Sequence, residues 1–159
     1  GQEEILTYGA FSYPIAFLIT DLANRSYGKI IARKIVYIGF TIGILFSLFV
    51  FLYDLISIRI AVGSGTAFII AQLLDIQIFD KLRKKKWFIA PLVSSVIGSI
   101  IDTLLFFSIS FYGTEVNWIK LSFGDLLVKV FVSLIMLVPF RFLLSYIGEF
   151  YNLKKKINA

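Results

Sequence analysis

The sequence predicts an all-α membrane protein, a polytopic bundle of about five transmembrane helices forming one domain over residues 1–159. Hydrophobic residues make up 58% of the chain and charged residues only 16%, whereas an ordinary soluble domain has about 45–50% apolar and about 25% charged residues. The apolar residues are grouped in long runs, and a run of about 20 such residues can cross a bilayer. These observations exclude a soluble globule and a disordered chain.

Five segments are long and apolar enough to be spans. The first is the shortest and weakest, and the second holds the run IGFTIGILFSLFVFLY. The third begins with Gly, Ala and Ser residues, and the fourth begins at Trp87, an aromatic residue typical of membrane interfaces. The fifth contains Pro139, which predicts a kink. The segments are Ile5–Leu22, Ile35–Tyr53, Ile60–Phe79, Trp87–Tyr112 and Leu121–Tyr146.

The basic residues lie mostly on one alternating side of these segments. Twelve of the 16 lysines and arginines are in the first connection (Arg25–Lys34), the third connection (Asp80–Lys86) and the tail after Tyr151. Because positive residues collect in cytoplasmic loops, we expect a multi-pass membrane protein with these parts and the C-terminus in the cytoplasm. The net charge of +6 therefore indicates topology and contact with membrane lipids, and we expect no nucleic-acid partner.

Several classes of chemistry are missing from the sequence. It contains no Cys and no His, which excludes disulfides, Cys/His zinc sites and thiol or histidine catalysis. It also contains no P-loop, no G-x-S-x-G elbow and no H-E-x-x-H pair. We therefore expect a protein that is not an enzyme, with no cofactor, no metal and no catalytic residue.

Ionisable residues inside the predicted spans are the strongest functional signal, because they are costly in a bilayer and usually face the bundle interior. Asp102 lies about 22 Å along its helix from Trp87, deep in the membrane, and it favours a substrate or a proton site. Gln72 and Asp75 share one helix face, and Lys129 follows Asp125 by one turn and can pair with it.

More ordinary roles remain open for most of these residues. Asp21 and Asp75 could cap their helices or pair with loop lysines. Lys129 could have the purely structural role of neutralising Asp125 or Asp102. Arg141 could extend its guanidinium to the interface. The Ser and Gly residues beside Asp102 are most often packing surfaces.

Three segments resemble a known family. GAFSYPIAFLITDLANRSYGKIIARK at 9–34 is similar to its pattern F-P-x-x-F-x-x-T-D-L followed by Y/F-G and A-R-[RK]. GTAFIIAQLLDIQIFDKLR at 65–83 is similar to A-x-x-x-x-Q-[IL]-L-D-[IV]-x-[IV]-F-x-x-L-[RK]. WFIAPLVSSVIGSIIDTLLFFSISF at 87–111 is similar to W-x-A-P-x-x-S-[ST]-x-x-x-x-x-x-D-T-x-x-F-F. The order and spacing identify the VUT (vitamin uptake transporter) family, the queuosine precursor transporters.

The resemblance implies a six-helix inner-membrane transporter that imports 7-deazaguanines, such as preQ0 and preQ1, for salvage into the tRNA nucleoside queuosine. The family's first helix has no counterpart here, and the connection at Asp54–Arg59 is short. We therefore expect one further helix ahead of Gly1. The implied alternatives are a substrate-capturing subunit of a multi-component vitamin transporter that needs a partner ATPase module, and a non-transport structural membrane protein; a homo-oligomer also stays open.

The resemblance also gives the polar residues a chemical role. A deazaguanine offers an amide N–H and an amino group on one edge, and a carboxylate accepts both in bidentate fashion. Asp102 and Asp75 are the carboxylate candidates, with a proton-carrying role open for the acid, and Gln72 could read the carbonyl. Further polar contacts and an aromatic lid over the flat base complete the expected substrate site. Its residues are Asp102, Gln72, Asp75, Asn24, Lys129, Phe68 and Phe106, with Phe79 as another candidate for the lid.

Overall fold

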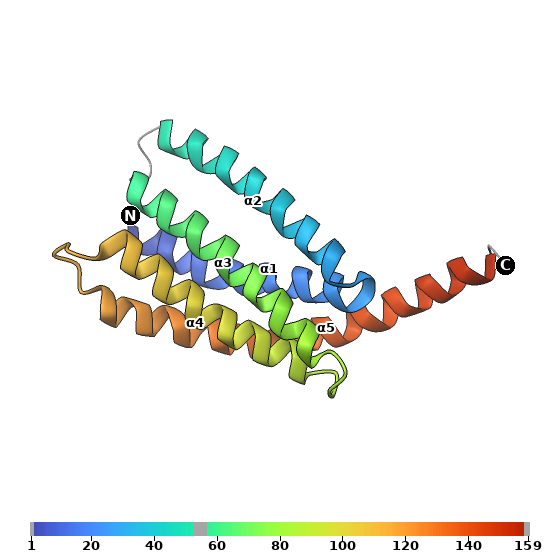
Figure 1. Ribbon diagram of the computed structural model, residues 1–159. Coiled ribbons are helices and arrows are strands. Elements are labelled where there is room, and N and C mark those ends of the chain that lie inside the picture. The colour runs from blue at the N-terminus through green and yellow to red at the C-terminus, as the bar shows by residue number, and fades with distance from the viewer. Residues whose placement is uncertain (1, 53–56, 158–159) are drawn as a thin grey trace.

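The computed structural model describes the backbone of residues 2–52 and 57–157, and side chains within 12–52 and 57–148. The described residues form five helices and no strand, which confirms the predicted fold class (Figure 1). The helices are α1 Gln2–Tyr27, α2 Lys29–Leu52, α3 Ile58–Leu82, α4 Ile89–Phe111 and α5 Trp118–Ile157.

The first connection is much tighter than the sequence predicts. The ten-residue link expected between Arg25 and Lys34 is helical except at Gly28, where α1 ends and α2 begins. Gly28 has a positive φ of 86° and its N–H donates to the carbonyl of Asn24 at 3.0 Å, which is the usual way for glycine to end a helix. The basic residues of this link therefore lie on helical turns.

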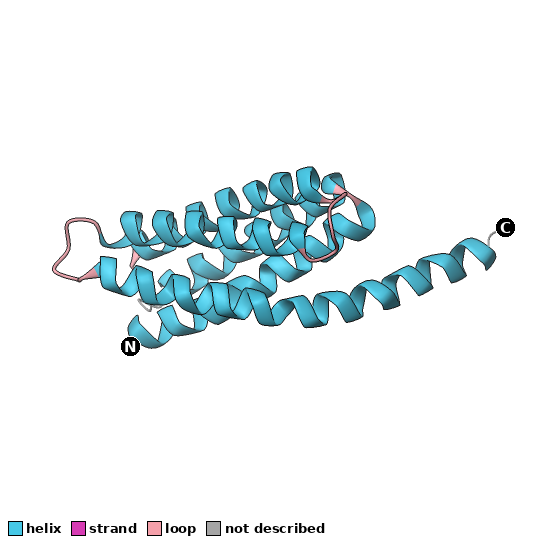
Figure 2. Ribbon diagram, turned by 90° about the horizontal axis from the view of Figure 1, so that it is seen from below, coloured by secondary structure: helices cyan, strands magenta, loops and turns pink. Residues whose placement is uncertain are grey.

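Four helices are long and apolar enough to cross a membrane, namely α2, α3, α4 and the 118–148 part of α5. In α1, side chains are described only from Ser12 onward, which leaves less than a span for comparison; the whole helix of 26 residues is about 39 Å long. These lengths and compositions support a multi-pass membrane protein. Pro139 lies inside α5, and the helix continues past it and beyond the end of the bundle (Figure 2).

The two basic connections lie at the same end of the bundle. Figure 1 shows the turn between α1 and α2 and the loop between α3 and α4 at one end, to which the C-terminal part of α5 also runs. The last turn of α2, the first turn of α3 and the α4–α5 loop lie at the opposite end. We call these the basic end and the far end; that the basic end faces the cytoplasm stays a prediction.

The core forms between α1, α3, α4 and α5. The α3–α4 pair has the most extensive contact, and α5 packs on both α1 and α4. Small residues allow this close packing: Ala67 and Ala71 of α3 are fully buried, and the Phe17 ring of α1 lies directly over Gly98 of α4. By contrast, α2 buries only Ala32 and Val36 among its described side chains, so it is the peripheral helix.

Gly98→Leu should destabilise the bundle. A Cβ at this position would lie 2.9 Å from two ring atoms of Phe17, which is 1% exposed, so the ring or its helix would have to shift. Overpacking of this kind costs about 1–3 kcal/mol, measured as a lower unfolding midpoint in detergent. Gly124→Leu is the matched control, because a Cβ there meets nothing within 4 Å. Equal midpoints for the two variants would contradict this packing.

Candidate functional site

Two clusters of buried polar side chains lie inside the bundle. The first, the inner centre, contains Asp21 of α1, Asp75 and Gln72 of α3, and serines of α4. Asp21 lies about 9 Å along α1 from its end at Tyr27, so this centre is in the half of the bundle near the basic end. The second, the charged triad, lies about 12 Å further along the bundle, as judged by the rise from Asp21 back to Tyr13.

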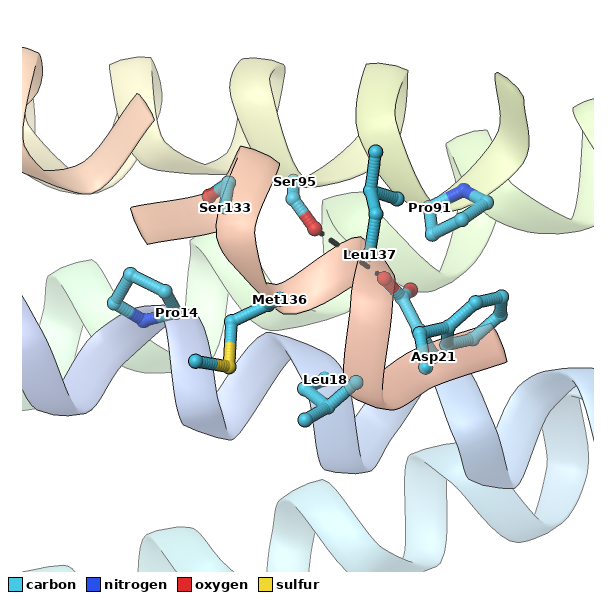
Figure 3. A pocket seen from close by; sticks show the side chains of 9 residues that line it. Pro14, Leu18, Asp21, Pro91, Ser95, Ser133, Met136 and Leu137 are labelled. Carbon is cyan, nitrogen blue, oxygen red and sulfur yellow. Dashed lines mark hydrogen bonds between the residues drawn. The ribbon is translucent and has the colours of Figure 1, made fainter. Parts of the chain in front are cut away.

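Asp21 is held by hydroxyl groups of α4. Ser95 donates to its carboxylate at 3.2 Å and Ser94 at 3.5 Å. Figure 3 shows Asp21 reaching toward Ser95, with Ser133 and Leu137 of α5 across a small crevice. The crevice has a volume of about 10 Å³, room for one water molecule, so the helices are closed around this centre.

Asp75 lies beside Asp21 but has no such support. The carboxyl group of Asp75 lies next to that of Asp21, on the facing helix. Asp75 is 0% exposed, and both of its oxygens lack a hydrogen-bond donor among the described residues. Such buried unsatisfied acceptors are rare in native proteins and call for a functional explanation.

Gln72, one turn before Asp75 on α3, has a hydrogen-bond partner for its side-chain oxygen but none for its Nε2 among the described residues. Its side-chain oxygen accepts a hydrogen bond of 2.8 Å from Thr20 of α1, which fixes the orientation of the amide. Its Nε2 is buried and, within the described residues, finds no acceptor. The Ser99 hydroxyl on α4 is in the same position, buried and without a described partner. The inner centre therefore presents free acceptors on Asp75 and a free donor on Gln72.

The charged triad consists of Lys129 and Asp125 on α5 and Asp102 on α4. The Lys129 ammonium lies 2.7 Å from Asp102 Oδ2 and 2.5 Å from Asp125 Oδ2, and it donates to the Thr103 hydroxyl at 3.3 Å. Thr103 in turn donates to Asp125 at 2.8 Å. The Lys129–Asp125 pair that the helical spacing predicts is thus confirmed.

The triad is enclosed by Tyr13 of α1. The Lys129 Nζ lies 4.9 Å from the centre of the Tyr13 ring, and the Tyr13 hydroxyl donates to the Ser64 carbonyl of α3 at 3.3 Å. The side chains of Lys129 and Asp102 are 4% and 1% exposed. Asp102 Oδ1 has no hydrogen-bond donor of good geometry among the described residues, so this oxygen is the open position of the triad.

The other three residues of the expected site are Asn24, Phe68 and Phe106. Asn24 donates to the Ile76 carbonyl at 3.1 Å and accepts from Arg83 at 2.6 Å, so its amide ties the basic ends of α1 and α3 together. Phe68 packs edge-on against Tyr13, and Phe106 packs against Phe107. Phe68 also packs against buried aliphatic residues of α1, α2 and α3 and lines the hollow between α2 and α3 described below.

Phe79 and Arg141 also make defined contacts. Phe79 packs edge-on against Phe140 and carries the Arg25 guanidinium 5.0 Å from its centre, so it belongs to the core at the basic end. The Arg141 guanidinium lies 5.1 Å from the Trp87 ring centre, as expected for an arginine that extends to an interfacial aromatic.

Asp21 is the main residue that the sequence analysis left out of the site. Helical spacing placed it near the end of its span, where a capping role is common. The available signal was the stripe of Phe17, Asp21 and Asn24 at intervals of four and three, which marks one buried face. Tyr13 was missed because a tyrosine within an aromatic-rich span carries no distinguishing pattern.

A larger hollow lies between α2 and α3 but is not suited to a polar base. Its volume is about 620 Å³, and it is lined mainly by apolar side chains, among them Phe40, Leu48 and Phe51. Charged residues are absent from its described lining. The buried charged side chains of the bundle interior are instead those of the inner centre and the triad.

Comparisons with known proteins identify a family and several named relatives. A family model described as "Putative vitamin uptake transporter" matches residues 7–144. A "Probable queuosine precursor transporter" of Haemophilus influenzae is 38% identical over 84% of this chain and 66% of its own length. A "Queuosine precursor transporter" of Escherichia coli is 33% identical over 96% of this chain and 79% of its own. No solved structure gives a significant match.

A third relative is more distant, and the chain spans only part of the length of all three. A "Probable queuosine precursor transporter" of Bacillus subtilis is 28% identical over 82% of this chain and 68% of its own length. The chain therefore spans about two thirds of the Haemophilus and Bacillus relatives and somewhat more of the Escherichia one.

Lys129→Met should lower the free energy of unfolding by about 3–5 kcal/mol, because it leaves two carboxylates buried without a cation. Equilibrium unfolding in mixed micelles measures this loss. The matched control is Lys29→Met, which removes the exposed pair with Asp80 at 3.2 Å and should cost no more than about 1 kcal/mol. If both variants lost the same amount, the triad would not be an interior feature.

Proposed function

The chain belongs to the vitamin uptake transporter family, and from this we propose that it imports 7-deazaguanine precursors of queuosine across the bacterial inner membrane. The names of its relatives in three bacteria support this substrate class. The long apolar helices support a multi-pass membrane protein, and the clustering of basic connections at one end supports an orientation with that end in the cytoplasm.

The observation that carries the proposal is the set of free hydrogen-bonding groups on α3. Asp75 offers two acceptor oxygens without donors, and Gln72 one turn away offers an N–H without an acceptor, among the described residues. The polar edge of a 7-deazaguanine has the complementary set, two donors on the ring N–H and the amino group and one acceptor on the carbonyl. We assign the bidentate contact to Asp75 and the carbonyl contact to Gln72.

Asp75 suits this role better than Asp21. Asp21 already accepts from Ser94 and Ser95, so a ligand would gain little from it. A bound base would instead satisfy the Asp75 oxygens, and hydrogen bonds to charged groups contribute about 1.5–3 kcal/mol. This gain also weighs against a purely structural protein, in which the unsatisfied groups would only reduce stability.

Import requires the bundle to open, because the crevice beside Asp21 is far too small for a base. Helix α5 covers this crevice with Ser133, Met136, Leu137 and Phe140, which recur at helical spacing. Pro139 lies among them and has no N–H to donate to the carbonyl of Ile135, so α5 can bend here at low cost. We propose that α5 is the helix that moves to admit the substrate.

Reconstitution distinguishes a self-sufficient carrier from the alternative, a capture subunit that needs an ATPase module. Uptake of labelled preQ1 by the protein alone in liposomes supports a self-sufficient carrier. Uptake that appears only with a co-expressed ATPase supports the alternative. Transporter relatives favour either of these over an enzyme.

Asp75→Asn should weaken binding of preQ1 by roughly 30–150-fold, because one acceptor of the bidentate pair becomes a donor, at a cost of about 2–3 kcal/mol. Binding is measured by scintillation proximity or calorimetry on the purified protein. Asp80→Asn is the matched control on α3, where the acid pairs with Lys29 and Arg83 at the surface, and it should bind normally. Unchanged binding by Asp75→Asn would remove Asp75 from the site.

An analogue that lacks the exocyclic amino group should bind the wild type about tenfold or more weaker, because one Asp75 oxygen then stays unpaired. In Asp75→Asn the same analogue and its parent should bind almost equally. Competition against labelled substrate measures both ratios. Gln77→Glu, on the exposed face of α3, serves as a control that keeps the wild-type ratio. Equal discrimination by wild type and Asp75→Asn would place the amino group elsewhere.

A further inference from the structure

The charge balance of the triad is incomplete. Lys129 supplies one positive charge, and Asp102 and Asp125 supply two negative charges when both are ionised. Among the described residues, the other titratable group facing the triad is Tyr13 of α1, which is neutral in its ordinary form, and from α3 only Ser64 reaches it, through the Tyr13 hydroxyl. A net charge of −1 in a buried site is strongly unfavourable unless it is compensated.

The ammonium of Lys129 cannot provide further compensation. A lysine has three N–H donors, and those of Lys129 are directed at Asp102, Asp125 and Thr103. The uncompensated group is Asp102 Oδ1, which is buried and lacks a good donor among the described residues. This oxygen is the natural position for an additional positive charge.

The geometry also links this position to helix movement. Asp125 is on the same helix as Lys129, whereas Asp102 is on α4, so the Lys129–Asp102 ion pair joins α5 to α4. Adding a positive charge to Asp102 would weaken the pair between the helices and leave the pair within α5 intact. The opening of α5 is the movement that the proposed transport requires.

We propose that the Asp102–Lys129–Asp125 triad is a proton-binding site that couples substrate import to proton movement; this inference rests on the proposed function. A proton entering from the far end adds to Asp102 Oδ1, forms one O–H bond and brings the triad to zero net charge. When the bundle opens toward the basic end, the same proton leaves and the carboxylate is restored. One proton thus crosses with each substrate molecule.

The test uses the purified full chain in liposomes with labelled preQ0, whose 7-substituent carries no charge. Two assays are run: accumulation driven by a pH gradient that is alkaline inside, and counterflow exchange without a gradient. Wild type should accumulate label above equilibrium only with the gradient, and a protonophore should abolish this. Asp102→Asn should lose gradient-driven accumulation and still exchange label by counterflow. Asp102→Glu, which keeps a proton-binding carboxyl, should recover part of the accumulation.

Three results would overturn the proposal. Wild-type accumulation that ignores the gradient, or Asp102→Asn accumulation equal to wild type, overturns the proposal. Loss of counterflow together with accumulation in a correctly folded Asp102→Asn would assign Asp102 to substrate binding and also overturn it. If Asp102→Asn is not monodisperse in detergent, Asp125→Asn, which removes the other negative charge, takes its place with the same criteria. Asp80→Asn is the control acid and should behave as wild type.

These assays separate the two hypotheses. Failure of wild type to bind or exchange any 7-deazaguanine would remove the proposed function itself. Normal exchange without coupling to protons would remove only the inference on the triad.

Discussion

The buried ion pair between Lys129 and Asp102 is the interaction on which the arrangement of the bundle depends. A charged group in a bilayer must find its partners inside the protein, and Lys129 finds them on two helices and against the ring of a third. This requirement sets the register of α5 against α4 and α1. The hydrogen bonds of Asp21 and Asn24 and the close packing of small residues against phenylalanine rings add to this arrangement.

The buried polar groups are of two kinds: some have hydrogen-bond partners on other helices, and others have none among the described residues. Asn24, Asp21 and Lys129 use their hydrogen-bonding capacity to join helices. The two carboxylate oxygens of Asp75, the Nε2 of Gln72 and one oxygen of Asp102 are buried without a hydrogen-bond partner among the described residues. Because unsatisfied buried groups lower stability, the open groups are the basis of both proposals, a base bound at the inner centre and a proton bound at the triad.

The helices also differ in how firmly they are held. The α3–α4 pair has the most extensive contact and carries most of the open groups. Helix α5 is held to α4 by the charged triad and covers the inner crevice near Pro139. A firm α3–α4 pair that carries the recognition groups, with α5 as its cover, is a suitable arrangement for opening a site to alternate sides of a membrane.

The sequence by itself determined the features that depend on local pattern. Long apolar runs predicted the helices, basic clusters predicted which connections share an end, and the spacing of Lys129 and Asp125 predicted their pair. The sequence did not predict the tight turn at Gly28. Basic residues are compatible with a helix, and the helix is interrupted only where Gly28 adopts a positive φ.

Only the tertiary structure decided which polar groups meet. Helical spacing placed Asp75 and Gln72 on one face of α3, but their partners depend on how α1 and α4 are rotated and shifted against it. The packing of α1 and α4 on α3 places Asp21 beside Asp75 and lets the Asn24 amide donate to the Ile76 carbonyl of α3. The packing of α5 on α4 places Lys129 beside Asp102. Periodicity reports which face a residue occupies within its own helix, whereas contacts across helices arise from the packing of all five together.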